Sequence, residues 1–541
     1  MTRTEQMGPA NTFGYSSLRQ RWLYPFFALW GLALGCFAVL YVIDQAKYGV
    51  SQGTANHHPF ESFWRFDPEL ASNAISSLVA LLVALLGIVI TVVSIVVQLS
   101  AQLYSGVGRM FLRERTNILV LGFYIVACIF GVWISFAARR DFAPRLGIAV
   151  MILLTTAGIA LVAPYFSFVF RLLEPSSIIA RIREEALAAA RAARNTTDEA
   201  AISALQSRMA MAFENITDLA SGAVASRDVV MASQAVDALR GVVSDYLPMK
   251  AEQPQAWFTL GAGLRRAPSF VALDSETKFV LEDRQVWVEW QVMQQYLRIY
   301  RQALIGSQEL NYLIAIDTRY IAEAGAFAND VQLLRLTGRF LNSYVRAALN
   351  ARDIRMACNV MNQIRLLVET LLNLRRNDDA LAMARQMSYY GTIALNMDLP
   401  FVTETVAHDL GALCQRANRI NFPEEVRLIG ILLGQEQLVT SSKPTPLGVL
   451  KARAKLGVFY LFEQKPHRAA VIREHLFKEP FSQLQAVRDS LSRNVQEEFW
   501  EVVERGYRDF DHLPTTHRDC LGQLFAGLGA QPSPATPSVA P

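Results

Sequence analysis

The stretch that decides the fold is residues 74–99, AISSLVALLVALLGIVITVVSIVVQL. It contains no Asp, Glu, Lys, Arg or His, and a helix that spans a membrane needs about 20 mostly apolar residues. Three further stretches before residue 171 satisfy the same requirement, at residues 22–43, 117–136 and 146–170. The sequence therefore predicts four transmembrane helices within residues 22–170, preceded by a short N-terminal segment, residues 1–21.

The composition agrees with a membrane protein. Of the 541 residues, 52% are hydrophobic and 18% are charged, whereas soluble domains have about 25% charged residues. The net charge of +4 is too small for a protein that binds nucleic acid through a strongly basic surface. Five scattered cysteines do not make a disulfide scaffold. These values exclude a wholly soluble chain and a disordered one.

The first apolar stretch has two features of a cleaved leader. Arg19 and Arg21 precede it, and Ala33-Leu34-Gly35-Cys36 resembles a lipoprotein cleavage box. Its apolar run is longer than the roughly 7–15 residues of a signal core, and no A-x-A site follows it. We therefore expect an uncleaved anchor.

The basic residues near the spans predict the orientation, because short cytoplasmic loops are enriched in Lys and Arg. With a cytoplasmic N-terminus, nine basic residues lie inside and five outside, and the C-terminus is also cytoplasmic. The inside set is Arg3, Arg19, Arg21, Arg109, Arg113, Arg115, Arg171, Arg181 and Arg183, and the outside set is Lys47, Arg65, Arg139, Arg140 and Arg145.

The second span carries a stripe of small and polar residues at alternating steps of four and three, with Leu, Val and Ile dominating the positions between them. Because lipid tails are as apolar as Leu, membrane helices associate through such residues. We expect the stripe to pack against the other spans or a second subunit, and the alternative is a water-lined pore in an oligomer. The stripe consists of Asn73, Ser77, Ala80, Ala84, Gly87, Thr91, Ser94, Gln98, Ala101 and Ser105.

Beyond this span, Arg109, Arg113 and Arg115 are expected at the lipid headgroups, where each gains about 1 kcal/mol from anionic lipid. The central part of each span lacks ionisable residues, which argues against an ion-coupled carrier.

The segment Gln98–Ser105 (QLSAQLYS), with Phe111–Arg115 (FLRER) and Leu121-Gly122, resembles a bacterial family of membrane proteins, domain of unknown function 2254. The similarity is best over residues 70–175. The family pattern has a proline and a basic residue where this chain has Gly106 and Val107, so the chain is a divergent relative. The resemblance implies a location in the bacterial inner membrane and no defined activity.

The second half, residues 171–530, has helical periodicity, so the fold class is all-α, with a large cytoplasmic helical domain after the membrane region. Ser177 is the expected N-cap of its first helix, and Thr196 with Glu199 has the spacing of a capping box. Residues 270–273 and 278–281 are compatible with a short strand pair. The tail, residues 531–541, is expected to be disordered. Helices are predicted at residues 177–194, 196–219, 227–246, 284–305, 309–325, 328–350, 352–374, 378–396, 400–418, 423–436, 446–463, 468–477, 480–490, 493–509 and 516–528.

Successive helices with short connections indicate a helical array, although no fixed repeat period is evident in the sequence. Such an array would be used as a docking surface or an oligomer scaffold. An all-α globule that packs only on itself is an equally good interpretation.

No motif for catalysis, a cofactor or a metal stands out. Walker A, G-x-S-x-G and H-E-x-x-H patterns are absent. His512, His517 and Cys520 are close in sequence but lack the paired spacing of a zinc site, and His57-His58 is expected in a hydrated loop.

We therefore expect a non-enzymatic, membrane-anchored interaction or assembly protein without a cofactor. Its partners would be the lipid bilayer, further copies of the chain and a cytoplasmic protein. The alternative is an oligomeric channel lined by the second span.

Overall fold

The computed structural model describes residues 31, 35–43, 68–103, 115–137, 144–172, 174–435, 441–493 and 512–526. Every regular element in these residues is helical, so the all-α prediction is confirmed. The chain divides into two units, residues 1–178 and 179–541.

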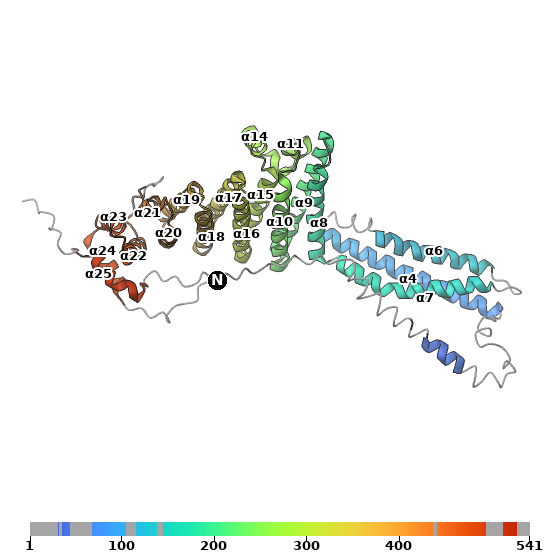
Figure 1. Ribbon diagram of the computed structural model, residues 1–541. Coiled ribbons are helices and arrows are strands. Elements are labelled where there is room, and N and C mark those ends of the chain that lie inside the picture. The colour runs from blue at the N-terminus through green and yellow to red at the C-terminus, as the bar shows by residue number, and fades with distance from the viewer. Residues whose placement is uncertain are drawn as a thin grey trace, which may run out of the picture. The chain divides into compact units, whose positions relative to one another are not determined.

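The first unit contains α4 (Pro68–Leu103), α6 (Arg115–Ala137) and α7 (Arg145–Leu172), which lie side by side (Figure 1). Each is long and apolar enough to cross a membrane. The described residues thus show three candidate membrane helices where the sequence predicts four. Of the first predicted span, only residues 31 and 35–43 are described, as helix, and this length is too short to test a crossing.

One face of α4 forms the core of this bundle. Its buried residues Ile75, Leu82, Val89 and Val96 recur every seven positions, so they return to nearly the same side of the helix. They pack against α6 and α7 together with buried residues of those helices such as Tyr124. The Tyr124 hydroxyl donates a 2.7 Å hydrogen bond to the carbonyl of Gly158 on α7, which satisfies its polar group inside the bundle.

The second unit is built of antiparallel helices in two layers (Figure 1). One layer contains α10, α16, α18, α20 and α22, and the other α9, α15, α17, α19 and α21, with each helix contacting the next in its layer. The helices are α8 (Pro175–Ala193), α9 (Glu199–Ser226), α10 (Val229–Lys250), α11 (Gln255–Phe258), α12 (Ala262–Arg265), α13 (Pro268–Val271), α14 (Ser275–Asp283), α15 (Trp287–Ala303), α16 (Gln308–Phe327), α17 (Val331–Asn350), α18 (Ile354–Asn373), α19 (Asn377–Asn396), α20 (Pro400–Arg419), α21 (Glu425–Leu433), α22 (Leu447–Phe462), α23 (Pro466–Leu476), α24 (Phe481–Ser492), η4 (Thr515–His517) and α25 (Arg518–Leu524).

The centre of this array has a fixed period that the sequence did not reveal. Helices α17, α18, α19 and α20 are each 20 residues long and begin exactly 23 residues apart, at positions 331, 354, 377 and 400. The residues at positions 329, 352, 375, 398 and 421 all have positive φ, between 52° and 61°. The helical array expected from the sequence therefore has a period at its centre, although none was found in the sequence.

The same turn produces this period each time. After each helix the chain enters the left-handed region for one residue, and the next amide bonds back to the helix five residues earlier, as Asp353 N does to the Ala348 carbonyl at 3.0 Å. The Asp353 side chain then accepts from the amide of Met356 at 2.8 Å and begins the next helix. One short turn thus ends one helix and caps the next.

Three local predictions in this unit were wrong. The suggested strand pair is helical, in α13 and α14, because Pro268 begins one helix and the Asp274 side chain caps the other. Ser177 lies inside α8, which begins at Pro175. The N-cap of α9 is Asp198, whose carboxylate accepts from the amide of Ala200, in place of the predicted capping box.

Candidate functional site

The two faces of α4 have opposite characters. Thr91 lies nine residues after Leu82, which is two and a half turns at 3.6 residues per turn, so the two side chains point in opposite directions. Leu82 is fully buried against α6 and α7, and Thr91 is exposed. The small and polar stripe therefore lies on the side of α4 that α6 and α7 leave uncovered.

All eight stripe residues from Asn73 to Gln98 are exposed. Two of the hydroxyls are satisfied within the helix, since Thr91 Oγ1 donates to the Gly87 carbonyl at 2.8 Å and Ser77 Oγ donates to the Asn73 carbonyl at 3.0 Å. The exposed members are Asn73, Ser77, Ala80, Ala84, Gly87, Thr91, Ser94 and Gln98.

The glycines used for packing inside the bundle are on the other two helices. A Cβ added to Gly131 on α6 would lie 2.6 Å from Cγ2 of Val79, and one on Gly158 on α7 would lie 3.1 Å from Cδ2 of Leu82. A Cβ added to Gly87 would meet nothing within 4 Å. The bundle therefore does not require a glycine at position 87.

The remaining predicted site residues are only partly described. Ala101 belongs to α4, but its side chain lies outside the described part, as do Ser105, Arg109 and Arg113 entirely. Arg115 is the first residue of α6 and is exposed. Their roles in packing, pore lining or headgroup contact stay predictions.

Within the array, buried charged residues join helices that are distant in sequence. The Lys250 ammonium lies 2.7 Å from carboxylate oxygens of both Glu289 and Asp330, and Glu289 is fully buried. Burial raises the pKa of Glu289, which Lys250 opposes. This cluster connects the end of α10, the start of α15 and the N-cap of α17.

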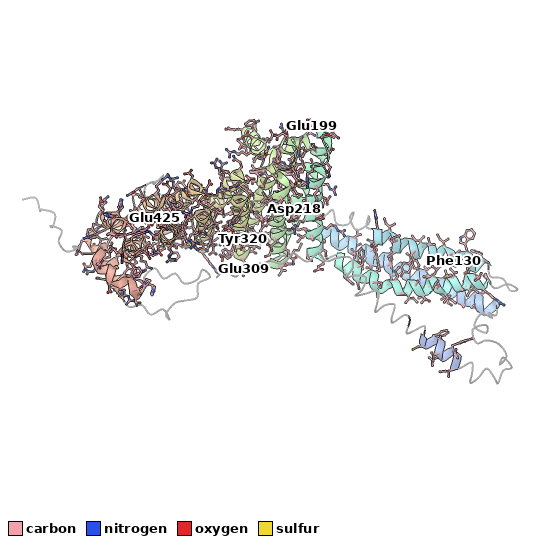
Figure 2. All side chains as sticks on the ribbon, viewed as in Figure 1. Phe130, Glu199, Asp218, Glu309, Tyr320 and Glu425 are labelled. Carbon is pink, nitrogen blue, oxygen red and sulfur yellow. The ribbon has the colours of Figure 1, made fainter. Side chains whose placement is uncertain are left out.

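A second buried carboxylate connects α10, α15 and α16. Asp317 Oδ1 lies 3.1 Å from Nε of Arg240, and the Tyr296 hydroxyl lies 3.3 Å from Oδ2. Burial raises the pKa of Asp317 to about 7, with Arg240 acting in the opposite direction. Beside it lies Tyr320 on α16, which is labelled in Figure 2. The guanidiniums of Arg240 and Arg319 lie 5.7 and 4.3 Å from the centroid of its ring.

A third carboxylate belongs to Glu425 on α21, which is labelled in Figure 2, and it is also buried. It accepts hydrogen bonds from Asn418 at 2.8 Å and from the Tyr460 hydroxyl at 2.7 Å, and it pairs with Arg468. The periodicity of the sequence did not reveal these three groups, because each assembles from several helices. Their geometry suits them to fix helix packing.

No group of three or more His, Cys, Asp and Glu residues in the described ranges is arranged to hold a metal ion. The ring of His517 packs against Phe462 at a centroid distance of 4.3 Å, and partial burial lowers its pKa. His57 and His58 lie outside the described residues.

Comparison with known families matches residues 19–237 to a family described as predicted membrane protein (DUF2254). The resemblance seen in the sequence is thereby confirmed, and the match extends beyond the membrane helices into α10. The chain is a predicted membrane protein of unknown function. No curated protein and no solved structure matches it.

Proposed function

We propose that the chain is a non-enzymatic, membrane-anchored interaction or assembly protein of the bacterial inner membrane, with both termini in the cytoplasm. The observation that carries the proposal is the 23-residue period from α17 to α20. Helices stacked in this way contact mainly their neighbours and expose extended surfaces, which is how repeat arrays bind other proteins.

The uncovered face of α4 supports the assembly part of the proposal. In a bilayer, close approach of helices is favoured by small residues such as Ala84 and Gly87, and the glycines that pack within the bundle lie elsewhere. A second copy meeting this face would bury it. Such a contact between identical faces forms a closed, two-fold dimer.

The channel is the second candidate, and the exposure of Thr91, Ser94 and Gln98 in the single chain also favours it. One observation argues against a channel. The Thr91 hydroxyl donates its hydrogen to the carbonyl of its own helix, so it could only accept hydrogen bonds from water in a pore. Conductance of the protein reconstituted in planar bilayers separates the two roles. Channel activity that Gln98→Leu alters would establish the pore, and the assembly role predicts no conductance.

The oligomeric state in lipid nanodiscs, measured by native mass spectrometry, tests the assembly role itself. We expect at least a dimer. A strictly monomeric chain in nanodiscs and in native membranes would contradict it.

A further inference from the structure

On the array, a groove of about 220 Å³ lies between α14, α15 and α17. Its floor is apolar and includes Trp290, Leu336 and Phe340, each less than a tenth exposed. Arg284 and Arg339 line it, and no acidic residue does. Neither guanidinium has an ion-pair partner among the described residues.

The helix that forms one wall of the groove is unusually basic on its solvent side. Arg335, Arg339 and Arg346 are exposed along one side of α17, and this helix contains no acidic residue. Like charges four residues apart, as at 335 and 339, destabilise a helix. An acidic partner would remove this cost. A second groove, between α17 and α19, is lined by Arg335 and Arg339 together with Asp378 and Asp379, so Arg339 borders a groove of mixed charge as well as the first one.

The chain contains a segment with the complementary chemistry. Residues 494–511, NVQEEFWEVVERGYRDFD, carry six acidic and two basic residues, and the sequence predicts helix over most of them. On a helix, Trp500, Val503, Tyr507 and Phe510 would form one apolar stripe at steps of three and four, with the acidic residues around it. This segment lies outside the described residues.

We propose that the groove between α14, α15 and α17 binds residues 494–511 of a second copy of this chain. Apolar side chains of the acidic segment would enter the groove and its carboxylates would meet Arg284 and Arg339. This inference rests on the proposed assembly function and adds to it a second contact, on the array.

The position of the segment in the chain favours a second copy over its own groove. The segment leaves α24 after Arg493 and returns before η4, and both elements pack against α22. The groove on α17 is separated from α22 by α18 and α20, about 24–30 Å at 8–10 Å per helix neighbour. To reach the groove of its own chain and return, each half of the 18-residue segment would have to be almost fully extended. The segment could then not form the helix that is proposed to dock. In the two-fold dimer proposed above, the segment of each copy would meet the groove of the other, so the contact is reciprocal.

Photo-crosslinking of the full-length chain in detergent locates the contact. A benzophenone amino acid replaces Trp500, and mixed isotope-labelled and unlabelled copies distinguish links between copies from links within one. We expect links between copies to α14, α15 or α17, and at least a tenfold loss with Arg284→Glu and Arg339→Glu together. Arg301→Glu makes the same charge change at an exposed residue of α15 that does not line the groove, and it should leave the links intact. Links confined to α22–α25 of the same copy, to lipid or to nothing would overturn the proposal.

A fluorescent peptide of residues 494–511, titrated with the same purified chains, measures the affinity of the segment for the groove. The peptide should bind the Arg284→Glu and Arg339→Glu chain at least tenfold more weakly, and a peptide with Glu501→Lys and Glu504→Lys should recover binding to that chain. Equal binding to both chains would remove the groove from the contact. If neither the crosslinks nor the peptide binding is observed and the chain is still oligomeric in nanodiscs, the proposed groove contact is wrong but the assembly function stands. A monomeric chain would remove the proposed function as well.

Discussion

Arg375 reaches from the turn between α18 and α19 to the turn after α20, two repeats along the chain, where its guanidinium donates to the carbonyl of Ile420 at 2.8 Å. It also donates to the carbonyl of Asn421 at 3.1 Å. Arg352 makes the corresponding bond to Met397 one repeat earlier, at 2.7 Å. These bonds satisfy carbonyls at the ends of helices two places along, so each turn also stabilises the turn two repeats later.

Two substitutions of Arg375 separate the contribution of its hydrogen bonds to stability from that of its left-handed backbone. Arg375→Ala loses both hydrogen bonds while the residue stays at φ 58°, so we expect a loss of about 1 kcal/mol of stability. Arg375→Gly loses the same bonds but relieves the left-handed backbone, so it should be closer to wild type. Thermal unfolding of the purified chains by circular dichroism measures the order. An alanine variant more stable than the glycine variant would contradict it.

The buried contact of Lys250 with Glu289 should respond strongly to removal of one partner. Lys250→Met leaves two carboxylates without their cation, one of them fully buried, and is expected to destabilise the array by about 3 kcal/mol. Adding Glu289→Leu should recover part of this loss, because the buried charge is then gone. Chemical unfolding of the single and double variants provides the comparison. A double variant less stable than the single one would show that the charge itself is needed.

Asp317 makes stability depend on pH. Its folded pKa of about 7 lies above the ordinary value of 3.8, so the folded state holds the proton more tightly. The unfolded chain therefore binds fewer protons between about pH 4 and 7, and stability falls as pH rises through this range, by at most about 1.4 kcal/mol per pH unit from this group. In Asp317→Asn this contribution should disappear. An unchanged pH profile of the unfolding midpoint would exclude Asp317 as its source.

The sequence predicted the membrane helices well because their signal is local. The stretches at residues 117–136 and 146–170 differ from α6 and α7 by at most two residues at each end. For α4, the predicted stripe from Asn73 to Ser105 already implied a helix longer than the apolar stretch, and the helix ends close to there, at Leu103. It begins earlier than predicted, at Pro68, because Ser and Asn continue a helix without being apolar. The composition of the stripe was visible in the sequence. The exposure of the stripe could not be predicted, because it depends on which face of α4 packs against α6 and α7.

In the helical array, the sequence predicted the individual helices better than their arrangement. Its helices were predicted, but their period was missed because it is a property of backbone conformation. The left-handed positions are Asn, Arg, Arg, Asp and Asn, and the N-cap positions after them begin as Asp330 and Asp353 but continue as Arg376 and Leu399. The groove was missed for a related reason. One of its walls is α14, part of which was interpreted from the sequence as compatible with a short strand.

The central claim, that copies of the chain associate through the uncovered face of α4, is tested most directly by Gly87→Leu. Gly122→Leu is the matched control, because neither glycine has a neighbour within 4 Å of an added Cβ and Gly122 lies on α6. We predict that Gly87→Leu folds normally and loses most of its dimer in nanodiscs by native mass spectrometry, while Gly122→Leu keeps it. Equal dimer fractions in the two variants would contradict the account.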